Sequence, residues 1–198
     1  MIVLSALCLY GESIDTQTER CKQGDLDSCY EVGVVLTSKE NRKDQEKKDA
    51  GMVYLRKACQ YGHAQSCDML GDNYYKDGLY QAAIPYLEVS CKREIKDACE
   101  ALGTIYRDGH DVRQDDVQAR VYYEKACGCG GADACINVGM IYRGGFGVPK
   151  DRGMEKSFFQ KACEAGSQTG CTFYQKMDNE DKGIAEPGLW TKLKSLFN

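Results

Sequence analysis

Cysteine pairs at one constant spacing recur along the chain. Seven residues separate the two members of each pair, and the pairs are Cys21/Cys29, Cys59/Cys67, Cys91/Cys99, Cys127/Cys135 and Cys163/Cys171. From one second cysteine to the next, the steps are 38, 32, 36 and 36 residues. Self-similarity at such a period is typical of an array in which pairs of helices pack on their sequence neighbours. We therefore expect one elongated array in this chain of 198 residues, with no separate catalytic lobe.

Each repeat is predicted to hold two helices, A and B, joined by a loop. Helix A begins near the second cysteine, and apolar residues follow at the third and seventh positions, as in Cys99, Leu102 and Tyr106. That spacing places them on one face of a helix. A glycine at the fourth position costs helix propensity, and it recurs at Gly33, Gly71, Gly103 and Gly139. Its recurrence predicts that a neighbouring helix passes too close for a side chain.

The segments around the first cysteines predict helix B and the turn that follows it. An aromatic residue lies five positions before the cysteine, at Tyr54, Tyr86, Tyr122 and Phe158. A glycine lies three positions after it, at Gly24, Gly62, Gly130 and Gly166, where a helix can end in the left-handed conformation. We expect Asp27, Asp97, Asp133 and Thr169 to cap the next helix A. Each cysteine pair therefore lies at the corner between helix B and the next helix A.

Three segments depart from this pattern. The glycine-rich loop 144–147 has neither a preceding strand nor a following Lys-Ser/Thr, so it predicts a turn between helices rather than a phosphate-binding loop. In the second repeat, Pro85 lies within helix B and Glu94 replaces the corner glycine, so we expect the least regular packing there. After Cys171 the pattern gives way to a polar linker from Asp178.

The two ends of the chain carry further predictions. The apolar run 2–10 has the length of a signal-peptide core and is too short to span a bilayer. Near the other end, apolar residues recur at helical spacing: Leu189, Trp190, Leu193, Leu196 and Phe197. They predict a helix that caps the array or, alternatively, docks on a partner or a membrane. The predicted organisation is a signal peptide over 1–12, the repeat array over 13–178, and the linker with its capping helix over 179–198.

Charge and cysteine content exclude several classes of function. The net charge is −4 and the basic residues are scattered, so we expect no nucleic-acid binding, which needs a basic face. A zinc site needs closer thiolate spacing or histidines, and the chain has only His63 and His110, so we predict no metal and no cofactor. An even, regular set of cysteines indicates a disulfide framework and an oxidising compartment.

The motif C-x-x-L-G-x-x-Y, a glycine- and aspartate-containing loop, and then Y-Y-x-K-A-C resembles Sel1-like repeats, specifically the Helicobacter cysteine-rich proteins. The resemblance covers about residues 20–175. It implies an all-α fold, an αα-superhelix or solenoid of Sel1/TPR-like repeats, with a disulfide joining the two cysteines of each pair. It also implies residence outside the cell or in the periplasm, and adaptor roles or β-lactamase and penicillin-binding activity. The shortened second repeat and the additional Cys129 depart from the pattern.

A binding scaffold is the function we favour from the sequence. In similar repeats helix A lines the concave surface, and its register places these residues there: Asp68, Asp72, Tyr75, Glu100, Thr104, Arg107, Ile136, Met140 and Arg143. Their charges grade from an acidic end to a basic one, which would orient a protein or peptide partner carrying the opposite charges. The alternative is a merely solvated face. We expect the protein to be a monomer.

Two enzymatic alternatives have less support. Serine β-lactamases use Ser-x-x-Lys, Ser-Asp-Asn and Lys-Thr-Gly, none of which occurs in the chain, so no catalytic residue is assigned. Thiol exchange is suggested by Cys127-Gly-Cys129. Cys129 is free, paired between molecules, or partnered with Cys8.

Overall fold

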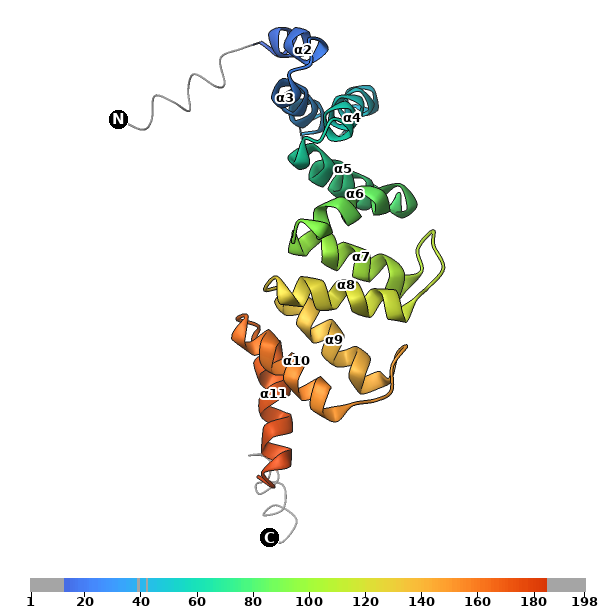
Figure 1. Cartoon of the computed structure of the whole chain (residues 1–198). Coiled ribbons are helices and arrows are strands. Elements are labelled where there is room, and N and C mark those ends of the chain that lie inside the picture. Colours follow the sequence, from blue (N-terminus) through green and yellow to red (C-terminus); the bar gives the residue numbers. More distant parts are fainter. Residues whose placement is uncertain (1–12, 39, 42, 185–198) are drawn as a thin grey trace, which may run out of the picture. The chain divides into compact units, whose positions relative to one another are not determined.

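The computed structural model describes residues 13–184 except 39 and 42, and this part of the chain contains helices and no strand. Figure 1 shows them in sequence order. The described helices are α2 (Ile14–Lys22), α3 (Leu26–Thr37), α4 (Gln45–Gln60), α5 (Ala64–Lys76), α6 (Tyr80–Lys92), α7 (Lys96–Asp108), α8 (Asp116–Gly128), α9 (Ala132–Gly144), α10 (Arg152–Glu164) and α11 (Gln168–Asp181). The predicted signal peptide and the helix predicted over 189–197 lie outside the described residues.

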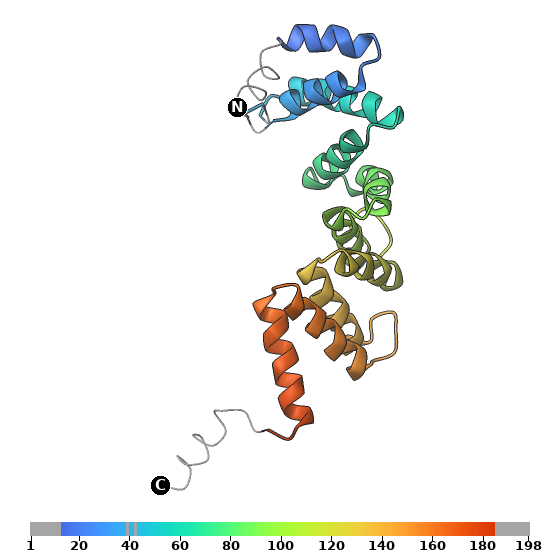
Figure 2. The ribbon, with the colours of Figure 1, turned by 60° about the vertical axis from the view of Figure 1, so that its left-hand side comes forward.

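The chain divides into two compact units, Met1–Ser90 and Cys91–Asn198, and the division falls within α6. In the first unit α2 packs on α3, α3 on α4, and α4 on α5. In the second unit the contacts run from α7 through α8, α9 and α10 to α11, again between sequence neighbours (Figure 2). This order of contacts, with disulfides between the repeats, confirms the predicted all-α solenoid class.

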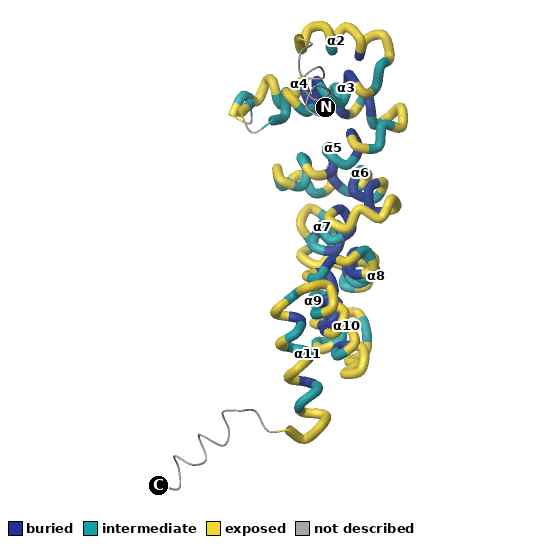
Figure 3. Tube along the Cα trace, turned by 90° about the vertical axis from the view of Figure 1, so that its left-hand side faces the viewer, coloured by how far each residue is buried: buried dark blue, intermediate teal, exposed yellow. Residues whose placement is uncertain are grey.

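Burial alternates along the helices of both units, so most helices have a buried side and an exposed side (Figure 3). The core of the array lies where each helix A meets its helix B. In the second unit Gly103 of α7 faces Tyr123 of α8, and Gly139 of α9 faces Phe159 of α10. A Cβ added at Gly103 would lie 2.6 Å from the Tyr123 ring, and one added at Gly139 would lie 2.7 Å from the Phe159 ring. The predicted close approach is confirmed.

The first unit repeats this arrangement with leucines. Gly33 of α3 faces Leu55 of α4, and Gly71 of α5 faces Leu87 of α6. Both leucines are buried, as are Tyr123 and Phe159. Because the partner always lies four residues before a first cysteine, one position in helix B supplies the contact in four repeats.

A second contact, found in three of the repeats, is a stacked aromatic pair. Tyr106 of α7 stacks on Tyr122 of α8, with ring centroids 5.6 Å apart and 7° between the ring planes. The equivalent pairs are Tyr142 with Phe158 and Tyr74 with Tyr86. The aromatic residue predicted near the end of helix B therefore pairs with the tyrosine at the seventh position of helix A.

Disulfides close the corners between repeats. The structure joins Cys21 to Cys29, Cys59 to Cys67, Cys91 to Cys99, Cys127 to Cys135 and Cys163 to Cys171. The predicted corner glycines Gly24, Gly62, Gly130 and Gly166 all have positive φ, and Glu94, at the equivalent position, has φ 62°. Each disulfide therefore spans a left-handed turn from helix B to helix A.

The predicted N-caps of helix A are wrong by two residues. Asp27, Asp97 and Asp133 lie in the first turn of their helices, and Thr169 lies within α11. The caps are Asp25, His63, Ile95, Gly131 and Ser167. They lie two residues earlier because the N–H of the second cysteine already donates to the carbonyl of the residue four positions before it, as Cys29 does to Asp25.

The structure also replaces the predicted linker with helix. Helix α11 continues through Asp181, and its acidic residues lie against α10: Lys156 forms ion pairs with Asp178 and Asp181. The polar composition of this segment therefore reflects pairing between helices rather than a loop. Pro85 lies inside α6, and the glycine-rich loop joins α9 to α10 as predicted.

Replacing Gly103 with alanine is expected to lower the free energy of unfolding by about 1–3 kcal/mol, because the new methyl group would overlap the buried Tyr123 ring. Gly128→Ala is the matched control, since Gly128 is also helical and its Cβ would meet nothing within 4 Å. The control should be neutral or stabilising by about 0.5–1 kcal/mol. Urea denaturation of the oxidised protein measures both, and equal effects would contradict the packing described.

Candidate functional site

Helices α7 and α9 carry six of the predicted binding residues, all in the second unit. We call the face formed by Glu100, Thr104, Arg107, Ile136, Met140 and Arg143 the A-face. None of the six is fully buried, and Met140 is 40% exposed. The A-face is therefore accessible to a partner in this unit, which is the first requirement of the predicted role.

Carboxylates crowd one end of the A-face. Burial raises the pKa of Glu100, and the charges of Asp133 and Asp97 raise it further, while Lys96 opposes them. Asp97 lies in the first turn of α7 and Asp133 in the first turn of α9, so two successive repeats contribute to the same negative region. A positively charged group placed there would relieve the repulsion between them.

Tyr123 reaches the A-face from helix B, and the sequence analysis did not identify it. Its ring fills the space beside Gly103, and its hydroxyl lies 3.0 Å from Oγ1 of Thr104. Burial is the main cause that raises the pKa of this phenol. The side chain is fully buried, so the hydroxyl has a fixed position beside Thr104. The signal in the sequence was the glycine, which marks where a large neighbouring side chain passes.

Arg143 is held by contacts on several sides. Its Nε donates to Oε1 of Glu155 at 2.6 Å, and its guanidinium lies 5.1 Å from the ring centroid of Phe159 and 5.2 Å from that of Phe173. Glu155 is buried on α10. Arg143 also contacts the sulfur of Met140. It is therefore a fixed feature of the A-face whose charge is largely balanced by Glu155.

Arg107 has a similar but more exposed environment. It forms an ion pair with Asp108 and lies over the Tyr123 ring, 5.9 Å from its centroid. Both arginines predicted to form the basic end are therefore already paired with carboxylates. Within the second unit the expected charge gradient therefore has a distinct acidic end at Glu100. At its basic end, the positive charges of Arg107 and Arg143 are largely balanced by Asp108 and Glu155.

The remaining predicted residues lie in the first unit, on α5. Ser90 donates a hydrogen bond to Asp68, Asp72 pairs with Lys76, and Tyr75 packs edge-on against Tyr80. These three share one helix; Asp72 pairs within it, whereas Asp68 and Tyr75 contact α6. A single surface combining them with the A-face stays a prediction.

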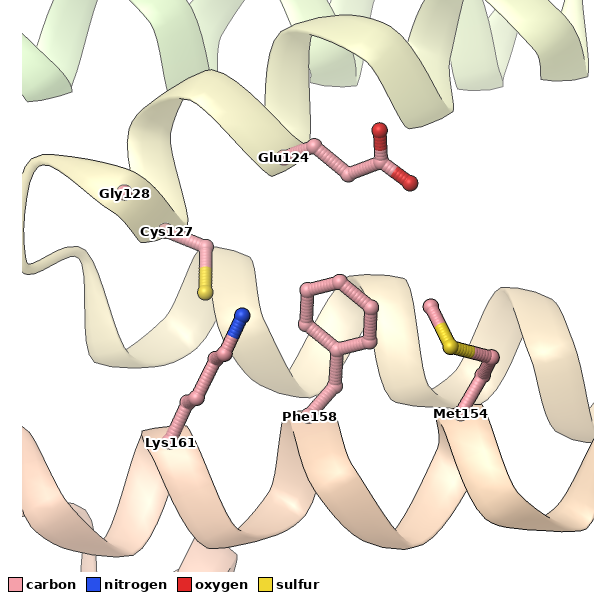
Figure 4. A pocket seen from close by; sticks show the side chains of 6 residues that line it. All are labelled: Glu124, Cys127, Gly128, Met154, Phe158 and Lys161. Atoms are coloured by element: carbon pink, nitrogen blue, oxygen red, sulfur yellow. The ribbon is translucent and has the colours of Figure 1, made fainter.

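A groove between α8 and α10 was not predicted. It has a volume of about 540 Å³ and is lined by Glu124, Cys127, Gly128, Met154, Phe158 and Lys161. Figure 4 shows Glu124 on one wall, with Met154 and Phe158 on the other, and Lys161 extending towards Cys127. Helix periodicity could not reveal it, because its two walls come from consecutive repeats.

A second hollow in the same unit contains the cysteine that the repeat pattern leaves over. It has a volume of about 720 Å³ and is lined by Cys91, Lys92, Glu94, Lys125, Gly128 and Cys129. Cys129 forms no disulfide in the part of the chain that is described, and it is half-buried. The alternative of a disulfide between Cys129 and Cys8 involves a residue outside the described part of the chain.

Among the described residues, no three histidine, cysteine or acidic side chains are grouped so that they could hold a metal ion. No described helix is long and apolar enough to cross a bilayer.

A family model described as Sel1 repeat matches residues 96–131 and 132–167. Helicobacter pylori cysteine rich protein B is 30% identical, and the alignment covers 64% of this chain and 95% of that protein, with a TM-score of 0.48. The chain belongs to the Sel1 repeat family.

Other solved Sel1-type structures have the same fold. A protective antigen of uropathogenic Escherichia coli with an SLR fold gives a TM-score of 0.69 at 21% identity, over 86% of this chain. The chain spans only 37% of the length of that antigen. A Sel1 repeat protein from Oxalobacter formigenes gives a TM-score of 0.54 at 25% identity, over 63% of this chain and 97% of that one. A comparison with curated protein sequences gave no match.

The two matched Sel1 repeats contain the residues described above. The first supplies Glu100, Thr104 and Arg107 of the A-face, and the second supplies Ile136, Met140 and Arg143. The groove of Figure 4 likewise takes three lining residues from each repeat. The A-face and the groove are therefore both features of this pair of Sel1 repeats.

Replacing Glu100 with glutamine is expected to stabilise the protein at pH 7 by up to about 1 kcal/mol, since the group is only partly buried. The pKa of Glu100 is raised in the folded state, so the charged form opposes folding. The gain should therefore shrink as the pH falls towards the ordinary carboxyl range, where Glu100 is protonated in both states. Thermal denaturation between pH 4 and pH 7 tests this, with exposed Glu164→Gln as control. An equal gain from the control, or a gain independent of pH, would refute the assignment.

Proposed function

We propose that this Sel1 repeat protein is a binding scaffold that holds a protein or peptide partner on its A-face. The observation that carries the proposal is an exposed apolar side chain, Met140, beside fixed polar groups. Arg143 contacts it on one side. Apolar contact area surrounded by oriented polar groups is typical of protein-binding surfaces.

Fixed side chains favour binding because less conformational entropy is lost when a partner arrives. Tyr123 is fully buried and its hydroxyl lies beside Thr104, and Arg143 is held by Glu155 and two aromatic rings. The acidic region around Glu100 favours a partner that brings positive charge to that end. Residues Asp68, Asp72 and Tyr75 of the first unit would extend the contact if a partner spans both units.

We also propose that the protein acts outside the cytoplasm, in the periplasm or after secretion. The support is five disulfides that close every described corner between repeats, since such bonds persist mainly in oxidising compartments. No observation on the described residues favours β-lactam hydrolysis.

Site-specific photo-crosslinking in cells tests the A-face. A photoreactive phenylalanine analogue at Met140 is expected to yield discrete crosslinked products. The same analogue at Val117, which is 46% exposed on α8, should yield none or different ones. In the protein that carries the analogue at Met140, Arg107→Gln together with Arg143→Gln should lower the yield several-fold. Arg143 contacts Met140, and Arg107 carries the other guanidinium group of the A-face.

Circular dichroism must show that the double variant remains folded, since removing Arg143 leaves Glu155 buried without its partner. Glu155→Gln added to the double variant serves as a second background in which no buried carboxylate is left unpaired. Crosslinking from Val117 but not from Met140 would contradict the proposed surface. So would a Met140 crosslinking yield that is unchanged in the double variant and in the double variant with Glu155→Gln.

A further inference from the structure

The two hollows of the second unit meet at one residue. Gly128 lines both the groove between α8 and α10 and the hollow that contains Cys129. Gly128 has no side chain, and a Cβ there would meet nothing within 4 Å, so no side chain divides the two hollows at this residue. Together they form one strip, which we call the B-groove, across the ends of the B helices. It lies on helices other than α7 and α9, which carry the A-face.

The charges along the B-groove are mainly positive. Lys92, Lys125 and Lys161 line it, each in the last turn of its helix. Lys125 lies 5.4 Å from the ring centroid of Tyr122 and Lys161 lies 4.8 Å from that of Phe158. Neither lysine forms an ion pair with a carboxylate of the described chain. Both ammonium groups are therefore fixed in position and available to an anion.

Two carboxylates also line the B-groove, and they are not equivalent. Glu124 already pairs with Arg120 at 2.6 Å and accepts a hydrogen bond from the Tyr142 hydroxyl at 3.4 Å. Glu94 is exposed in the second hollow. Three lysines line the strip against two carboxylates, one of which is already paired with Arg120, so the lining has excess positive charge. The wall that α10 contributes to the first hollow is apolar at Phe158 and the partly exposed Met154 (Figure 4).

We propose that the B-groove is a second docking surface, which binds a peptide segment of a partner protein that combines acidic and apolar side chains. The apolar side chains contact Phe158 and Met154, and the carboxylates lie against Lys125 and Lys161. Charge complementarity argues for this chemistry, because a basic segment would meet unpaired ammonium groups. An extended chain would contact both hollows at once, since Gly128 lines the two and places no side chain between them.

Fluorescence anisotropy of labelled peptides with the intact, oxidised protein tests the proposal. The probe is a short peptide in which aspartate alternates with leucine. One control peptide carries lysine in place of aspartate, and another carries serine in place of leucine. Binding of the first peptide that exceeds both controls by at least about fivefold is expected at low ionic strength. Equal binding of the three peptides would overturn the proposal.

Variants at Gly128 separate charge from bulk. Gly128→Gln and Gly128→Glu add side chains of nearly the same size at a helical position with free space. Gly128→Glu is expected to weaken binding of the aspartate–leucine peptide about fivefold or more relative to Gly128→Gln, since only the former repels the peptide. Lys125→Gln with Lys161→Gln should also weaken it, while Lys150→Gln in the α9–α10 loop should not.

Amide chemical-shift changes locate the bound peptide. Shifts concentrated at Met154, Phe158 and Lys161 are expected, with little change at Met140 on the A-face. Equal affinity of the two Gly128 variants, or shifts concentrated on the A-face, would refute the B-groove as the binding surface. The peptide experiment reports on the B-groove and the crosslinking experiment on the A-face, so either proposal can be refuted while the other stands.

Discussion

The turn from one repeat to the next depends on a disulfide that closes a very short loop. In each of the five corners, the chain leaves helix B through a left-handed residue and re-enters helix A within a few residues. A closure of this length contributes about 2–3 kcal/mol by the loop-entropy model. Because a single pair of helices buries too little apolar surface to be stable alone, these links and the contacts between neighbours together maintain the array.

Within each repeat, the fixed corners allow the closest packing to repeat in register. Gly103 admits the Tyr123 ring, and the same contact brings the tyrosine hydroxyl up to Thr104 on the A-face. The packing that stabilises a repeat therefore also places a buried hydroxyl against Thr104, a partly exposed residue of the A-face. The same regularity sets α10 beside α8, which creates the groove of Figure 4. Structure and candidate binding surfaces thus share one set of contacts.

Features that depend on one helix, or on the turn at its end, could be predicted from the sequence. Cysteine spacing predicted the corners, and the glycine in helix A predicted the close approach. The caps were misplaced because Asp97 and Asp133 suit a first turn as well as a cap, whereas the actual caps, Ile95 and Gly131, form no side-chain hydrogen bond. Pairing of Arg143 with Glu155 and the groove itself require the relative placement of two helices, which spacing along the chain does not specify.

Disulfide mapping tests the central claim most directly. The protein is alkylated, digested without reduction and analysed by mass spectrometry. Each of the ten paired cysteines should be linked only to the partner eight positions away, and Cys129 should be alkylated. Linkages between cysteines of different corners, or corners found as free thiols in the folded protein, would contradict it.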